Sequence, residues 1–454
     1  MPLSHITSLI HAETHCVLAF SGGLDSTVLL HQLMCWKNEQ RISSSESHIR
    51  VLHIHHGLSP NADDWALHCK QICEKWKVPY EVLHVKINLH SSSSIEAAAR
   101  DVRYQVLFEK LRPGECLLTA QHLDDQCETI LLALKRGSGP TGLAGMSLKR
   151  RINGYLHLRP FLNLSREYLE AYAKKHQLSW INDESNVDNC YDRVFLRLHI
   201  IPLLKKRWPY FNKSTLRSAA LCAEQEQLLD ELLAGQLEKL IDEQGALYFI
   251  PLLAISEVHR HALLRRWIAI QGGKMPSREA LKRITFEVMR SRKDAQPRLR
   301  CITHEVRRYR QKLYWLPQLT SLNNYILIWA DRNQPLCLPQ NLGYLQANNN
   351  IVQFRFPTNN EQITIRFVAH GYYNILGRFG RCKMKKLWQE LGVPPWQRQR
   401  IPLIYYNEEL IGSPELFTTF EGISKDKQGW KPVWIKTIKS NCKIQDLHGS
   451  IQEY

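Results

Sequence analysis

The chain lacks the usual features of secreted and membrane-anchored proteins. Its first residues, MPLSHITSLIHAETH, contain no basic run followed by a long apolar core, so no signal peptide is expected. No window approaches the roughly 18 uninterrupted apolar residues that a membrane span requires. The 12 cysteines are scattered without a C-x-x-C pair, which argues against a disulfide framework and against zinc or iron–sulfur sites. These absences predict a reduced, cytoplasmic protein with no membrane partner.

The chain has fewer acidic than basic residues. The chain has 43 Asp and Glu against 60 Lys and Arg, a formal net charge of +17. Such an excess attracts polyanions, of which nucleic acid is the commonest, although a basic enzyme with another substrate is the alternative. A length of 454 residues with 44% apolar residues predicts two or three globular domains.

Strand-like and helix-like segments alternate through the first 200 or so residues. Short apolar runs at 15–20, 50–57, 80–87 and 115–121 are each followed by helical periodicity. This alternation predicts an α/β catalytic domain over residues 1–212, with a parallel sheet flanked by helices. Ligands bind beyond the carboxyl ends of such strands, so the segments SGGLDS, HHG and QHLDD are expected to face one crevice.

The rest of the chain has other patterns. Amphipathic periodicity predicts a mostly helical domain over residues 213–320, and the Asn-rich stretch 321–350 is typical of a linker. Strand patterns with one basic helix predict a small α+β domain over residues 351–454.

The segment SGGLDS joins an apolar strand to a helix. Two glycines allow a tight turn with exposed N–H groups, and the N-terminus of the helix attracts anions, so phosphate is the natural ligand. The segment matches neither a Walker A loop nor the G-x-G-x-x-G of dinucleotide sites. A carboxylate beside phosphates, here Asp25, indicates a Mg²⁺ ion between them. The alternative is that Ser21 and Asp25 are ordinary turn and cap residues.

This loop resembles the phosphate-binding signature of the N-type ATP pyrophosphatases, or PP-loop enzymes, which cleave ATP to AMP and pyrophosphate. Further segments are similar to the tRNA(Ile)-lysidine synthetases, in the longer form with two C-terminal domains. They are IHHGLSPNADDWALHCKQIC (54–73), EAAARDVRYQ (96–105), HLDDQCETILLALKRGSGPTGLAGM (122–146), RPFLNLSREYLEAYAKKHQLSWINDESNVD (159–188), MPSREALKRI (275–284) and KMKKLWQELGVPPWQRQRIPLIYY (383–406).

The resemblance implies an adenine nucleotide alpha hydrolase-like fold and a ligase. Such an enzyme joins the ε-amine of free L-lysine to C2 of the wobble cytidine in the CAU anticodon of tRNA(Ile). The cytidine is first adenylated, and AMP and pyrophosphate are released. ATP and Mg²⁺ are the implied cofactors, and the oligomeric state is left open, a homodimer included. The expected ATP-binding residues are Ser21, Gly22, Gly23, Leu24, Asp25 and Ser26, with Asp25 also the metal ligand.

The catalytic candidates are Asp25, Arg100, Asp125, Glu128 and Arg193. Asp125 and Glu128 are three residues apart on a predicted helix, hence on one face. One could bind Mg²⁺ and the other accept a proton from the lysine ammonium, whose pKa is ordinarily about 10.4, but the sequence does not say which. The simpler alternative is that both acids only favour the positive end of that helix, where Asp124 is expected to act as a cap.

Arginines are expected to hold the charge that develops on the α-phosphate or pyrophosphate. Arg100 is a candidate with Arg103 beside it, although solvation of a helix face would explain both. Arg193 lies in YDRVFLR, which resembles the family's D-R-N-x-x-R motif except that Val194 replaces the asparagine. A second departure is Gln121, where the family usually has a histidine.

Basic clusters interleaved with aromatic residues occur beyond the catalytic region. Lys383, Lys385, Lys386, Arg265 and Arg266 are the expected tRNA-binding residues, through phosphate contacts. Each cluster alone is more often a solvated face. The rival functions are a tRNA thiolation enzyme, which would need a reactive cysteine pair, a small-molecule amide synthetase, and a non-catalytic tRNA-binding protein.

Overall fold

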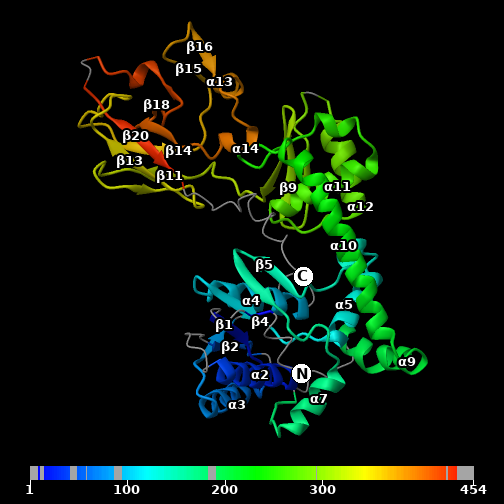
Figure 1. The fold of residues 1–454 in the computed structure, drawn as a ribbon. Helices are drawn as coiled ribbons and strands as arrows, with labels where there is room; N and C mark the ends of the chain where they lie inside the picture. The colour runs from blue at the N-terminus through cyan, green and yellow to red at the C-terminus, as the bar shows by residue number, and fades with distance from the viewer. Residues whose placement is uncertain are drawn as a thin grey trace. The chain divides into compact units, whose positions relative to one another are not determined.

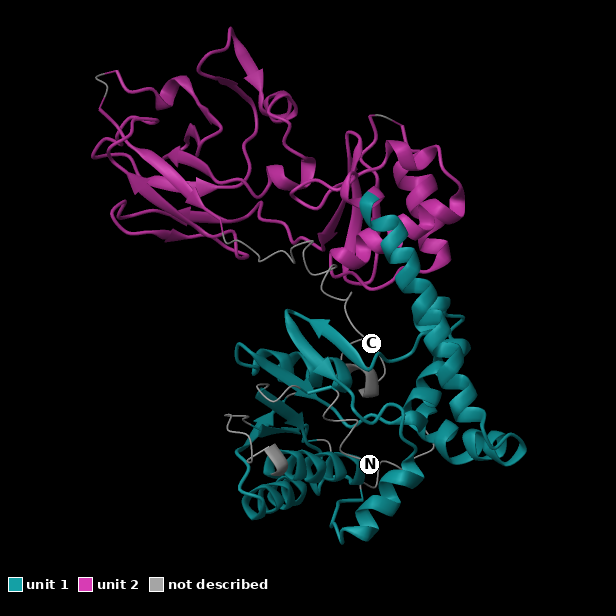
Figure 2. Cartoon of the chain, viewed as in Figure 1, with its two compact units in different colours: residues 1–235, 443–454 teal, residues 236–442 magenta. Residues whose placement is uncertain are grey.

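The structure is a computed structural model that describes residues 9–10, 15–40, 49–57, 59–85, 95–182, 191–292, 294–425 and 428–436 (Figure 1). The chain divides into two compact units, residues 1–235 with 443–454, and residues 236–442 (Figure 2). Among the described residues, no helix is both long and apolar enough to cross a membrane.

A six-stranded sheet forms the centre of the first unit, in the order β3-β2-β1-β4-β6-β5. Its strands are β1 (His15–Ala19), β2 (Ile49–His55), β3 (Tyr80–His84), β4 (Glu115–Leu118), β5 (Lys149–Ile152) and β6 (Tyr155–Leu158). All neighbours are parallel except the edge pair β5 and β6. The expected parallel α/β sheet is confirmed. Because β2 and β4 flank β1 on opposite sides, the chain reverses its direction of travel across the sheet at β1, where ligand crevices form.

Apolar residues cover both faces of this sheet. Val17 of β1 packs in one buried cluster and its neighbour Leu18 in another, as the alternation of side chains along a strand requires. The helices α2 (Leu24–Gln40), α3 (Ala62–Lys75) and α7 (Arg166–Lys175) contribute to the cluster of Leu18, and α4 (Ile95–Glu109) to that of Val17. Burial on both faces explains why the central strands β1 and β4 are almost continuously apolar after their first residue.

The remaining helices of this unit follow β4 and β6. They are α5 (Leu123–Lys135), α6 (Pro140–Leu143), α8 (Asp192–Phe195), α9 (Ile201–Arg207) and α10 (Phe211–Glu238), which extends into the second unit. A π-helical turn, η2 (Leu196–Ile200), separates α8 from α9. Pro202 follows it and has no N–H with which to continue the α-helical hydrogen bonds, which accounts for the irregular turn.

The first part of the second unit combines helices with an antiparallel sheet. The helical elements are η3 (Ile250–Leu253), α11 (Glu257–Ile270), α12 (Arg278–Arg283) and η4 (Ile284–Met289). The strands, in sheet order, are β7 (Leu247–Tyr248), β10 (Lys312–Pro317), β9 (His304–Tyr309) and β8 (Arg298–Arg300). The expectation of a mostly helical region missed this sheet. Glu305 is fully buried in it between Arg298 and Arg307, so charged pairs interrupt the apolar alternation that marks a strand.

The rest of the second unit consists mainly of short antiparallel strands. One sheet contains β11 (Ile326–Ile328), β14 (Ile363–Arg366), β17 (Leu403–Tyr406), β18 (Glu409–Ser413) and β19 (Phe417–Thr418). Another contains β12 (Leu336–Cys337), β13 (Tyr344–Asn348) and β20 (Lys431–Ile435). The hairpin β15 (Tyr372–Asn374) and β16 (Arg381–Lys383) precedes α13 (Met384–Glu390), and α14 (Pro395–Arg398) and η5 (Phe420–Gly422) complete the region.

Residues 321–350 do not form the expected linker, because they supply β11, β12 and β13. Leu322, Trp329 and Leu345 are buried in one core with Trp430, so the segment is part of the globular region. Its asparagines mark turns between short strands, a composition that resembles a linker when the sequence alone is read. The end of the expected α+β domain, residues 437–454, lies outside the described residues.

Candidate active site

The SGGLDS segment forms a tight turn between β1 and α2. Gly22 has a φ of +78°, and a Cβ there would lie 2.6 Å from Ile181 Cδ1 and 2.8 Å from Cys69 Sγ. Its carbonyl accepts a hydrogen bond from the Ile181 N–H at 2.9 Å. Only glycine satisfies both the positive φ and this close approach.

Hydroxyl groups hold the turn in place. Ser26 donates to the Gly23 carbonyl at 3.0 Å and lies 3.2 Å from the Ser21 hydroxyl, and Thr27 Oγ1 donates to the Gly22 carbonyl at 3.3 Å. Leu24 is buried and begins α2, so the positive end of a 17-residue helix dipole adjoins the turn. The turn has the geometry of an anion site.

Asp25 lies at the centre of a charged group. Its Oδ2 is 3.0 Å from Arg166 Nη1 and 3.7 Å from His122 Nε2. Burial raises the pKa of this carboxyl, while the neighbouring His122 and Arg166 act to lower it. Its Oδ1 is buried with no hydrogen-bond partner among the residues that the structure describes. A buried carboxylate oxygen in this position is available to a cation.

His122 links Asp25 to Asp125. It caps α5: its Nδ1 accepts from the Asp124 N–H at 3.2 Å, while its own N–H donates to Asp125 Oδ2 at 3.0 Å. Because Nδ1 is an acceptor, the ring proton is on Nε2, which faces Asp125 at 3.5 Å as well as Asp25. The two carboxylates are thus held beside one imidazole.

Asp124 is not the cap that the sequence suggested. Its carboxylate accepts from the Arg166 N–H at 3.0 Å and from Asn212 Nδ2 at 2.8 Å, and it lies 3.5 Å from Lys205 Nζ. These contacts join α5 to α7, α9 and α10.

Glu128 is fully buried and paired with two arginines. Arg197 Nε lies 2.7 Å from its Oε1, and Arg193 Nη1 lies 3.4 Å from its Oε2. Burial raises the pKa of Glu128, and Asp125 adds to this, while the two arginines oppose it. Burial also tends to lower the pKa of Arg197, but Glu128, Asp125 and Asp25 outweigh it and raise the pKa. Arg197 also contacts Asp125 Oδ1 at 3.2 Å.

A cavity of about 250 Å³ lies between the glycine turn and the end of β4. It is lined by four of the five catalytic candidates, Asp25, Arg100, Asp125 and Arg193, together with Ser21, Gly23, Ser26, Arg103, Tyr104, Thr119 and Gln121. Glu128 instead lines a second cavity of about 360 Å³ with Asp124, Glu167, Arg197 and Lys205. The structure therefore divides the candidates between two cavities. Val194, the departure from the family's motif, is buried and lines neither of them.

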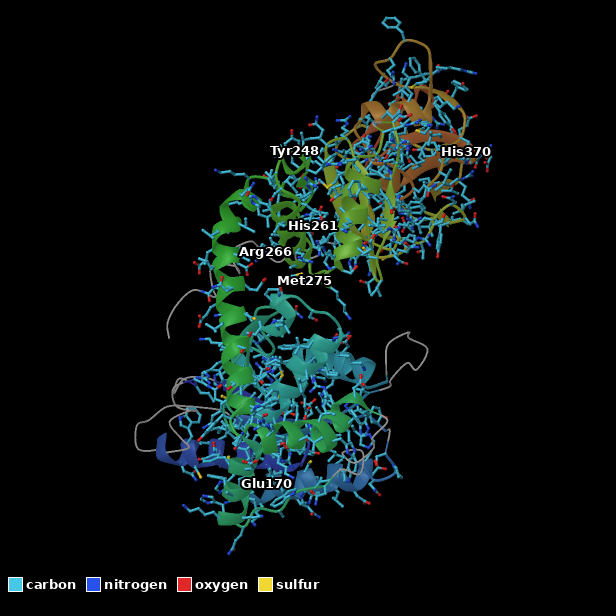
Figure 3. All side chains as sticks on the ribbon, turned by 90° about the vertical axis from the view of Figure 1, so that its right-hand side faces the viewer. Glu170, Tyr248, His261, Arg266, Met275 and His370 are labelled. Carbon is cyan, nitrogen blue, oxygen red and sulfur yellow. The ribbon has the colours of Figure 1, made fainter. Side chains whose placement is uncertain are left out.

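Sequence reasoning missed Arg166, Arg197 and His122. Arg197 stands four residues after Arg193 in YDRVFLR, a spacing that places both on one helical face, and that signal could have been used. Arg166 also pairs with Glu170, labelled in Figure 3, and nothing in its sequence context indicates that it reaches Asp25.

The carboxylates of the first cavity fit a magnesium ion. The described part of the chain contains no group of three or more His, Cys, Asp or Glu side chains suited to a metal. Mg²⁺, however, is commonly held by one or two carboxylates, with water and substrate phosphates completing its shell. Asp25, with its unpartnered Oδ1, supplies such a carboxylate.

The expected tRNA-binding residues lie in the second unit. Lys383, Lys385 and Lys386 are exposed where β16 joins α13. Arg265 and Arg266 lie on α11 and are half-buried, and Arg266, labelled in Figure 3, donates to the Ala262 carbonyl at 3.4 Å.

The two cysteines that stand closest together in the sequence are not reactive thiols. Cys69 and Cys73 are buried, and burial raises the pKa of each thiol to about 12. At neutral pH they are therefore protonated and poorly nucleophilic, which argues against sulfur transfer through them.

Three protein-family models match the chain. A PP-loop domain matches residues 3–204, a TilS substrate binding domain residues 247–314, and a TilS substrate C-terminal domain residues 363–434. The tRNA(Ile)-lysidine synthase of Edwardsiella ictaluri is 52% identical over 420 residues, 92% of this chain and 94% of that protein. The synthase of Salmonella typhi is 49% identical over 428 residues, 94% of this chain and 98% of that protein. Among solved structures, the U34-tRNA thiolase NcsA of Methanococcus maripaludis aligns with 49% of this chain and 78% of its own, with a TM-score of 0.41 and 16% identity.

Proposed function

This chain belongs to the tRNA(Ile)-lysidine synthase family, and we propose that it joins L-lysine to C2 of the wobble cytidine in a tRNA(Ile) with a CAU anticodon. The single observation that carries the proposal is the cavity in which the glycine turn, Asp25, Asp125, Arg100 and Arg193 meet. The proposal is supported by the match of the chain to an ATP-using PP-loop domain and to two further domains of the same family.

The first proposed step is adenylation of the cytidine. Cytosine O2 is a poor leaving group, and attack of this oxygen on the α-phosphate of ATP, with loss of pyrophosphate, converts it into one. The N–H groups of the glycine turn and the start of α2 would bind the phosphates. Mg²⁺ held by Asp25 would neutralise phosphate charge. Arg100 and Arg193 line the same cavity and would stabilise the charge that develops.

The second proposed step is attack by the ε-amine of lysine on C2, with departure of AMP. The lysine ammonium must lose a proton before it attacks. Asp125 faces the cavity and is the better placed acceptor, because Glu128 is buried between Arg193 and Arg197. We assign Glu128 to holding these two arginines.

The second cavity suits free lysine. Asp124 and Glu167 can face its ammonium groups, and Lys205 can face its carboxylate. The Arg193–Glu128 pair connects the two cavities, because Arg193 lines one and Glu128 the other.

The second unit is the proposed site of tRNA binding. It carries basic clusters, among them Lys383, Lys385 and Lys386. Beside them, Phe379 is fully exposed at the tip of the β15–β16 hairpin, and Tyr372 is 61% exposed. Lysines beside open aromatic rings suit phosphates and unpaired bases. The cytoplasm, where ATP, lysine and tRNA occur together, is the proposed location.

The test is incubation of the purified chain with ATP, Mg²⁺, labelled lysine and unmodified tRNA(Ile) that has a CAU anticodon. Label should enter the tRNA only with ATP, and Asp25→Asn should abolish it while Lys135→Ala, a change at an exposed ion pair, should not. Pyrophosphate release without label would mean another nucleophile. Absence of ATP turnover with tRNA still bound would favour a non-catalytic tRNA-binding protein.

A further inference from the structure

A chain of hydrogen bonds runs beneath the first cavity, from Arg159 to Tyr104. Arg159 Nη2 lies 3.1 Å from His157 Nδ1, and His157 Nε2 lies 2.8 Å from Thr119 Oγ1. Thr119 is bonded in turn to Gln121 Oε1, and Gln121 Nε2 lies 3.1 Å from the Tyr104 hydroxyl oxygen. Arg159, His157 and Thr119 are almost completely buried, while Gln121 and Tyr104 are half-buried and line the cavity.

In each hydrogen bond of this series, only one of the two groups can be the donor. Arginine is always a donor, so His157 Nδ1 accepts and its proton is on Nε2. Nε2 then donates to Thr119, whose own hydroxyl proton goes to the Gln121 carbonyl oxygen. The Gln121 amide nitrogen donates to the Tyr104 oxygen. Burial and the charges of Arg159, Arg150 and Arg100 lower the pKa of His157 to about 3, so the imidazole stays neutral near neutral pH.

We propose that Gln121 is a positioning residue that aims the Tyr104 hydroxyl proton into the nucleotide cavity. Because the Tyr104 oxygen already accepts from Gln121, its proton remains to be donated to an anionic oxygen of the bound ligand. The same ring is packed by two arginines, with Arg100 Cζ 5.3 Å and Arg103 Cζ 5.9 Å from its centroid. Tyr104 thus holds two cations and one donor together at the wall of the cavity. The inference rests on the proposed function for the identity of that ligand, ATP.

Gln121 stands where the resemblance to the family leads to the expectation of a histidine, and the two side chains can make the same hydrogen bonds. A neutral imidazole has one acceptor nitrogen and one donor nitrogen, and a glutamine amide has a carbonyl acceptor and an NH₂ donor group, so either side chain can receive the Thr119 proton and donate to Tyr104. Glutamate has nearly the same shape as glutamine but only acceptors when ionised. At position 121 it would accept the Tyr104 proton and turn that donor away from the cavity.

The experiment is a double-mutant cycle on ATP affinity, measured by calorimetry with ATP and Mg²⁺ on the full chain. Gln121→Glu and Tyr104→Phe should each weaken ATP binding about 10-fold, because each removes one hydrogen bond to a charged ligand. The double variant should be no weaker than either single variant. Gln121→His should bind like the parent, and the KM for lysine should not change in any of them.

Two results would overturn this inference alone. Additive losses would mean that Gln121→Glu acts by its charge and not through Tyr104, and an unchanged affinity in Tyr104→Phe would remove the proposed donor. Failure of the unaltered chain to bind ATP would instead remove the proposed function, and this inference with it. Unchanged thermal unfolding of Gln121→Glu and Tyr104→Phe would show that both variants fold.

Discussion

Arg197 Nε lies 2.7 Å and Nη2 3.2 Å from the two carboxylate oxygens of Glu128, a forked contact made by the π-helical turn η2 to the buried side of α5. Such a pair cannot lose one partner without leaving an uncompensated charge in the protein interior. The contact therefore fixes where α5 and η2 meet, and with it the border between the two cavities.

Arg197→Ala should lower the free energy of unfolding of the first unit by about 3 kcal/mol. This is the lower end of the range for a broken buried pair, because Arg193 still faces Glu128. Urea unfolding measures the change. The control is Lys135→Ala, which breaks an ion pair whose two side chains are each 61% exposed and should cost less than about 1 kcal/mol. Equal losses in the two variants would contradict the assignment.

Gly22→Ala should abolish ATP binding and lower the free energy of unfolding by about 3 kcal/mol. The positive φ strains any L side chain by roughly 1–2 kcal/mol, and contact with Ile181 and Cys69 adds to it. Gly154→Ala is a matched control, because Gly154 has a φ of +83° with nothing within 4 Å of the added Cβ. Gly154→Ala should lower the free energy of unfolding by only about 1 kcal/mol and leave ATP affinity unchanged. Calorimetry and urea unfolding distinguish the two.

Stability should fall on acidification through His157. Its pKa in the folded state is about 3, below its ordinary value of 6.5, so between these values the unfolded chain binds more protons. The stability that His157 confers is therefore complete above pH 6.5 and is lost progressively as the pH falls towards about 3. The slope from this residue approaches 1.4 kcal/mol per pH unit, about the value for one proton. His157→Gln keeps a donor for Thr119 and should flatten the profile of urea unfolding against pH; an unchanged slope would contradict this.

The basic and aromatic residues of the β15–β16 hairpin and α13 should affect tRNA binding differently. Replacing Lys383, Lys385 and Lys386 by alanine removes phosphate contacts. The slope of log binding constant against log salt concentration should therefore decrease in magnitude by about 2–3. Phe379→Ala removes a stacking ring and should weaken binding about 10-fold at every salt concentration, with the slope kept. Filter binding across a salt series serves as the assay. A changed slope in Phe379→Ala, or an unchanged one in the lysine variant, would be evidence against these roles.

The sequence alone determined the parallel α/β sheet and the glycine turn between β1 and α2. Both could be predicted because apolar periodicity and glycine conformation are local properties, although the pairing of β1 with β4 and the contact of Gly22 with Ile181 join distant residues. Local patterns did not predict the sheet around Glu305, because its strands contain buried charged residues. They also wrongly predicted a linker over residues 321–350, because short strands there are separated by asparagines. There, pairing with distant residues decided the structure.

Only the tertiary structure decided how the catalytic candidates are arranged. Arg166 and Asp25 are 141 residues apart in sequence, and Arg197 and Glu128 are 69 apart, so no spacing rule connects them. The fold also separated Glu128 from Asp125 although both lie on one helix, because the arginines of α8 and η2 hold Glu128 in the second cavity. A side chain's partners depend on which elements pack against it, and that packing is a property of the whole folded unit.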